Sequence, residues 1–157
     1  MADQQPVAEE AVTVSHFFAA SPRRVFEAWA SLESLTLWMT PYPHARVATE
    51  VSVDFRVGGG FRFIMTGDDS TCEVWGEYLE IVPPSRLVFT WTGATTGDRV
   101  TRVTVQLRAH RGGTELTLTQ ERLPRRESTE GYLAGWGIML SHLEHYLTQA
   151  TASEHSP

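Results

Sequence analysis

The chain has 157 residues, 41% hydrophobic and 20% charged, so it fits one globular domain that can bury a sizeable core. Its net charge of −6 argues against nucleic acid as a partner, because binding the phosphate backbone requires a basic surface. It contains no lysine and a single cysteine, Cys72, which excludes Schiff-base chemistry, an internal disulfide and a cysteine-cluster metal site.

The first third of the chain predicts one strand followed by two short helices. Residues 12–20 alternate and are rich in β-branched and aromatic side chains, which favours a strand. Ser21 can cap a helix that has Pro22 at its first position, and Trp29 lies on the apolar face of that helix. A second helical turn is expected at residues 34–39.

The middle of the chain predicts a series of strands separated by turn residues. Phe61 and Phe63 share one face of their strand, and Arg62 points to the other. Gly76 interrupts a long strand, which indicates a bulge or a close backbone approach. The glycine-rich turn at 111–113 predicts a hairpin between the last two strands. The strands are expected at 47–57, 61–66, 71–82, 87–92, 100–110 and 114–122.

The end of the chain predicts one long amphipathic helix, from about Thr129 to Ala150. Tyr132, Trp136 and Tyr146 follow helical spacing on one face. The same helix contains three glycines, each of which lowers helix propensity by about 1 kcal/mol. We therefore expect a backbone, a side chain or a ligand to approach the helix closely at Gly131, Gly135 and Gly137.

The pattern predicts a single domain at residues 11–150 between disordered tails at 1–10 and 151–157. No apolar run approaches the ~20 residues of a membrane span, so no membrane insertion is expected. The acidic N-terminus lacks the apolar region of a secretory signal, so we expect a cytoplasmic protein. Exposed sheet edges make a homodimer plausible.

Several motifs occur in the order found in one known family. They are PRRVFEAWAS, Trp38, DFRVGGGFRFIM, GEYLEIVPPSRLVFTW, GGTELTLTQERLP and the pair Gly135-Trp136. Together they resemble the activator of heat-shock protein 90 ATPase homologue family, within the START-like, SRPBCC or birch-pollen-allergen-like superfamily. The resemblance extends from about Pro22 to Leu147 and is typical of a small bacterial member.

The resemblance implies an α+β helix-grip fold. In that fold a curved seven-stranded antiparallel sheet has two short helices after its first strand and a long C-terminal helix over its concave face. Members of the superfamily mostly bind lipids, sterols, polyketides or other apolar molecules between sheet and helix, and some are cyclases or hydrolases. Relatives often have histidine where this chain has Gln120, which cannot act as a base at neutral pH.

The aromatic and apolar side chains of the predicted strands and of the long helix predict the wall of a hydrophobic cavity. A few polar groups in that wall would provide selectivity. Gln120 is the polar candidate that shares a face with apolar neighbours on its strand. The predicted ligand-binding residues are Trp38, Phe61, Phe63, Met65, Trp75, Phe89, Trp91, Gln120, Tyr132, Trp136, Met139 and Leu140.

The sequence offers little support for catalysis or for a metal. His44 with Glu77 or Glu121 would be the candidate titratable pair, and no catalytic residue is assigned. His142 and His145 have a spacing that can ligate a metal, but a third ligand is not apparent, so neither a metal nor a cofactor is predicted.

Three functions follow as hypotheses. The first is binding of a small hydrophobic or amphipathic molecule, resembling a lipid, a polyketide or an aromatic compound, in a cavity between sheet and helix. The second is a cyclase or hydrolase that acts on a similar substrate in the same cavity. The third is a protein-interaction domain similar to the co-chaperone after which the family is named.

Overall fold

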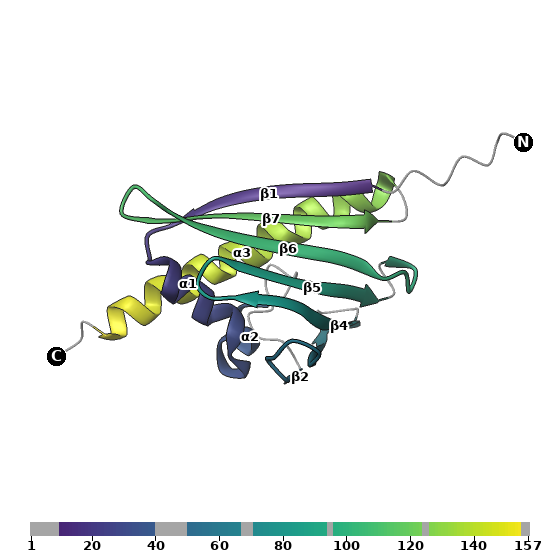
Figure 1. Cartoon of the computed structure of the whole chain (residues 1–157), viewed down its shortest axis with the longest axis horizontal. Coiled ribbons are helices and arrows are strands. Elements are labelled where there is room, and N and C mark those ends of the chain that lie inside the picture. Colours follow the sequence, from purple (N-terminus) through teal and green to yellow (C-terminus); the bar gives the residue numbers. More distant parts are fainter. Residues whose placement is uncertain (1–9, 40–49, 67–70, 94–95, 124–125, 155–157) are drawn as a thin grey trace, which may run out of the picture.

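In the computed structural model, seven antiparallel strands form one curved sheet in the order β1-β7-β6-β5-β4-β3-β2. The structure describes residues 10–39, 50–66, 71–93, 96–123 and 126–154. The strands are β1 (Glu10–Phe18), β2 (Glu50–Val53), β3 (Gly60–Thr66), β4 (Thr71–Val82), β5 (Arg86–Gly93), β6 (Thr101–His110) and β7 (Gly113–Leu123). The predicted α+β helix-grip fold is confirmed, because α3 (Arg126–Glu154) crosses one face of this sheet (Figure 1).

The two short helices are joined at a single serine. Ser21 caps α1 (Pro22–Ala30) by accepting a hydrogen bond from the backbone N–H of Arg24, as the sequence predicted. Ser31 ends α1 and also caps α2 (Leu32–Trp38), accepting from the N–H of Ser34 at 3.0 Å. The second helix therefore begins before residue 34, because Ser31 already supplies its cap.

The regular pleat of β3 and β4 decides which side chains face the helices. Phe61 and Phe63 are buried on the concave side, as predicted, and they pair across the sheet with Gly76 and Val74. A Cβ atom at Gly76 would collide with the Thr90 carbonyl oxygen and with the ring of Phe61, so this glycine permits a close backbone approach.

The sequence also allowed a bulge at Gly76. The irregularity of β4 instead lies further along the strand, between Tyr78 and Glu80. Because the strand stays regular through Gly76, Trp75 points away from the interior and is 41% exposed. The prediction that Trp75 lines the cavity is therefore wrong.

The hairpin between β6 and β7 is confirmed. Arg111 and Gly112 both adopt positive φ, at 49° and 80°, which closes the tight turn. The two strands present one continuous buried face to the helices, formed by Val103, Val105, Leu107, Leu116, Leu118 and Gln120.

The long helix α3 has 29 residues and extends past both predicted ends. It packs on the concave side of the sheet through Tyr132, Trp136, Met139, Leu140, Leu143 and Leu147, all of which are buried. Gly131 and Gly137 instead face outward, and a Cβ atom on either would have no neighbour within 4 Å. The predicted close approach at these two glycines is therefore wrong.

No helix in the described ranges is long and apolar enough to span a membrane.

Candidate functional site

The candidate site is the interior between the concave face of the sheet and the three helices. Aromatic rings from the sheet and from the helices meet there: the ring centroids of Trp91 and Trp136 are 5.1 Å apart, and those of Trp29 and Phe89 are 6.2 Å apart. Ten predicted wall residues are buried in this interior, namely Trp38, Phe61, Phe63, Phe89, Trp91, Gln120, Tyr132, Trp136, Met139 and Leu140. Met65 lies on β3, but its side chain is outside the described part of the structure.

A small cavity lies among these side chains. Its volume is about 10 Å³, which is close to the space that one water molecule requires. It is lined by Trp29, Leu35, Met39, Phe61, Phe63, Tyr78, Leu87 and Phe89. This pocket among the described residues is much smaller than the ligand cavity that the sequence predicted.

Five of the eight cavity-lining residues were missing from the predicted site, namely Trp29, Leu35, Met39, Tyr78 and Leu87. Trp29 was predicted only as part of an apolar helix face, a pattern that indicates burial without saying what the residue faces. Leu35, Met39 and Leu87 are buried aliphatic residues whose role as a wall depends on how the short helices dock. Helix docking leaves no periodic signal in the sequence.

A chain of hydrogen bonds crosses the buried interior from α3 to β5. The Trp136 indole Nε1–H donates to Gln120 Oε1 at 2.8 Å, and Gln120 Nε2 donates to Thr101 Oγ1 at 2.9 Å. The Thr101 hydroxyl then donates to the Trp91 carbonyl oxygen at 2.6 Å. Gln120 thus faces the interior as predicted, with both ends of its amide engaged by the protein.

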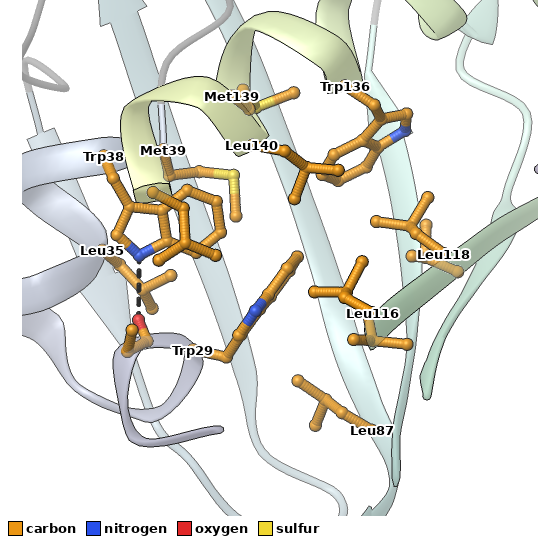
Figure 2. Close-up of a cluster of buried hydrophobic side chains, with 14 of the residues drawn as sticks. Trp29, Leu35, Trp38, Met39, Leu87, Leu116, Leu118, Trp136, Met139 and Leu140 are labelled. Carbon is orange, nitrogen blue, oxygen red and sulfur yellow. Dashed lines mark hydrogen bonds between the residues drawn. The ribbon is translucent and has the colours of Figure 1, made fainter. Parts of the chain in front are cut away.

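Two other buried indoles are different, because their N–H groups lack a partner. Among the described residues, Trp29 Nε1 and Trp91 Nε1 are buried polar side-chain atoms without a hydrogen bond. The nearby Trp38 Nε1 donates to the Ala28 carbonyl oxygen at 2.9 Å, as Figure 2 shows. Such unpaired buried donors are rare in folded proteins, and each of them requires a physical explanation.

Among the residues whose side chains the structure describes, no charged side chain is buried in this interior. Glu77 is exposed, and Glu121 forms an ion pair with Arg102 at 3.1 Å on the outer face of the sheet. His44, the proposed partner of these carboxylates, lies outside the described residues. Neither Glu77 nor Glu121 therefore supplies the buried acid or base that the enzyme hypothesis requires.

Tyr78 is the ionisable group on the cavity wall. Burial raises the pKa of its hydroxyl above the ordinary value, and the negative charge of Asp54 raises the pKa further. The Tyr78 hydroxyl is consequently protonated at neutral pH, and it can donate or accept a hydrogen bond without introducing a charge.

A larger hollow lies on the outside, where α1, α2 and α3 meet. It has a volume of about 270 Å³ and a half-polar lining. Ser34 Oγ and the Tyr146 hydroxyl are 2.9 Å apart there, and Arg24 Nη2 donates to the Leu147 carbonyl oxygen at 3.1 Å. These two contacts fasten α1 and α2 to the long helix and so hold the helical wall of the interior.

No group of three or more potential metal ligands exists within the described residues. His142 is half-buried and His145 is exposed, so the pair on α3 does not converge on a common site.

Comparison with known proteins places the chain within one family. The pattern of the family described as "Activator of Hsp90 ATPase homolog 1-like protein" matches residues 19–148. No protein with curated annotation is similar enough to this chain to count as a match.

Solved structures share the fold over most of the chain. The protein of unknown function SA2116 from Staphylococcus aureus is 20% identical, with a TM-score of 0.78 and 92% of this chain and 96% of that chain covered. Protein NE0264 from Nitrosomonas europaea is 25% identical, with a TM-score of 0.77 and 90% and 96% covered. An uncharacterised protein from Rhizobium leguminosarum is 25% identical, with a TM-score of 0.75 and 90% and 95% covered.

Proposed function

We propose that this chain, which belongs to the activator of Hsp90 ATPase homolog 1-like family, binds one small uncharged molecule in the interior between its sheet and its helices. The observation that carries the proposal is an aromatic interior in which the described residues place no charged group. Apolar walls with a few polar groups are typical of small-molecule sites. A ligand of largely aromatic or apolar character would fit the rings of Trp29, Phe61 and Phe89.

Binding in the pocket lined by Trp29 and Phe61 requires that pocket to widen, because its 10 Å³ holds no more than about one water molecule. The helical side of the wall consists of Leu35 and Met39, at α2 and its C-terminal end. Methionine has three rotatable bonds and adapts readily to a new neighbour, so Met39 is suited to give way.

Binding of Nile red, an uncharged fluorescent dye, tests the proposal. Leu35→Phe adds volume to the cavity wall, and Leu37→Phe makes the same change on the same helix at a side chain that is 45% exposed. We expect native protein and Leu37→Phe to bind the dye with equal affinity and Leu35→Phe to bind it several-fold more weakly. Thermal unfolding shows that each variant is folded before its affinity is measured.

Two outcomes would count against the proposal. The first is the absence of dye binding by the native protein at temperatures well below unfolding. The second is equal binding by Leu35→Phe and Leu37→Phe, which would place the dye elsewhere on the surface.

A further inference from the structure

Trp29 combines two observations that point to a missing hydrogen-bond partner. Its side chain is 2% exposed and lines the cavity, and its Nε1–H has no acceptor among the described residues. The indole N–H is a donor only, so it cannot be satisfied by another donor. In the same core, the N–H groups of Trp38 and Trp136 both have protein acceptors at hydrogen-bond distance.

The unpaired group matters because a buried donor without a partner is costly. Tryptophan is usually placed where its N–H reaches an acceptor. Trp91 has an unpaired N–H as well, but it is not part of the cavity lining, so the inference rests on Trp29. A ligand that brings an acceptor into the cavity would remove this cost.

The surroundings restrict the charge of that acceptor. The cavity lining contains aromatic and aliphatic side chains, and Tyr78 is the lining residue that carries a hydroxyl. A carboxylate or phosphate would be buried there without a cation among the described lining residues, and burying an unpaired charge is strongly unfavourable. A carbonyl or ether oxygen can accept from Trp29 at no such cost, and the protonated Tyr78 hydroxyl provides a second donor on the same wall.

We propose that the ligand carries a neutral oxygen acceptor, such as a ketone carbonyl, on an aromatic or apolar framework, and that this oxygen accepts a hydrogen bond from Trp29 Nε1–H. This inference rests on the proposed function, because it names the chemical class that the same site selects. The hydrogen bond would give the site selectivity over hydrocarbons of equal shape.

A pair of probes with one difference tests the inference. In 2-acetylnaphthalene a carbonyl oxygen stands where 2-isopropenylnaphthalene has a methylene group, so the two have similar shapes and only the ketone offers an oxygen acceptor. The chain has 5 tryptophans, and each indole N–H gives one signal in a nitrogen–proton correlation NMR spectrum. Trp29→Phe assigns the Trp29 signal, and Trp75→Phe is the matched control because Trp75 lies on the outer face.

We expect the ketone to move the Trp29 N–H signal downfield while the Trp38 signal, already bonded to Ala28, stays in place. The ketone should bind about tenfold more tightly than the hydrocarbon, as expected for one added neutral hydrogen bond. Trp29→Phe should abolish this preference, and Trp75→Phe should preserve it. If Trp29→Phe does not fold, resonance assignment of the native protein identifies the Trp29 signal, and the native spectrum and the two affinities still decide.

The contradicting outcomes separate the two proposals. Equal affinities for both probes, with the Trp29 signal unmoved, would overturn the inference and leave the proposed function standing. A Trp29 N–H that stays in contact with a bound water molecule when the ketone binds would overturn the inference as well. Failure of both probes to bind would overturn the proposed function and the inference together.

Discussion

The hydrogen-bond chain through Gln120 gives a stability prediction with a definite size. Gln120→Leu keeps the approximate volume of the side chain but removes the acceptor of the Trp136 N–H and the donor to Thr101. Leaving the Trp136 N–H buried and unpaired costs about 1–3 kcal/mol, and the lost bond to Thr101 adds about 1 kcal/mol. We therefore expect Gln120→Leu to lower the free energy of unfolding by about 2–4 kcal/mol.

Urea unfolding followed by circular dichroism measures this loss, and thermal unfolding checks it. A loss of this size lowers Tm by about 5–15 °C for a chain of this length. Gln106→Leu is the matched control, because Gln106 is exposed on β6. We expect the control to change the free energy of unfolding by no more than about 0.5 kcal/mol.

A double-mutant cycle shows whether the partner is indeed Trp136. Trp136→Phe removes the orphaned donor, so it should cost about 1–2 kcal/mol less in the Gln120→Leu background than in the native protein. Additive effects of the two substitutions, within about 0.5 kcal/mol, would refute the reasoning, because they would mean that the two side chains do not interact.

Three further predictions follow from the same structure. Trp75→Ala should change the free energy of unfolding by about 0.5 kcal/mol at most in urea titrations, whereas Phe61→Ala should cost about 3–5 kcal/mol; similar losses would contradict the outward orientation of Trp75. Gly76→Ala should cost about 2–3 kcal/mol, because the new Cβ atom meets the opposite strand, whereas Gly137→Ala on the open face of α3 should stabilise by about 0.5–1 kcal/mol; the opposite signs would be inconsistent with the two environments. The raised pKa of Tyr78 means that the unfolded chain loses this proton first, so the stability due to Tyr78 is present below pH ~10 and decreases as the pH rises above it. Urea unfolding on both sides of that pH should show a smaller decrease in Tyr78→Phe, and an equal decrease would argue against a buried hydroxyl.

The arrangement of the sheet could be predicted because it depends on local pattern. Alternation placed Phe61 and Phe63 on one face, and the apolar neighbours of Gln120 placed it toward the interior. Trp75 could not be placed with the same argument. Its orientation depends on where the strand is irregular, and that position lies after Tyr78, where the sequence has no glycine to mark it.

The state of the cavity could not be predicted from the sequence. Its volume is the small difference between the space under the helices and the side chains that fill that space, including Leu35 and Met39. The unpaired N–H of Trp29 could not be predicted from the sequence either. Trp38 on the next helix has the same indole donor, yet its N–H donates to the Ala28 carbonyl oxygen. The open surroundings of Gly131 and Gly137 likewise depend on how α3 is rotated on the sheet.

The most direct test of the central claim is native mass spectrometry of the freshly purified protein, before and after addition of 2-acetylnaphthalene. A bound molecule in the interior predicts an added mass in a ratio of one per chain, either retained from the cell or acquired from the probe. This mass should disappear when the protein is denatured. A protein that carries no added mass, and acquires none at a saturating concentration of the probe, would contradict the claim that this interior is a binding site.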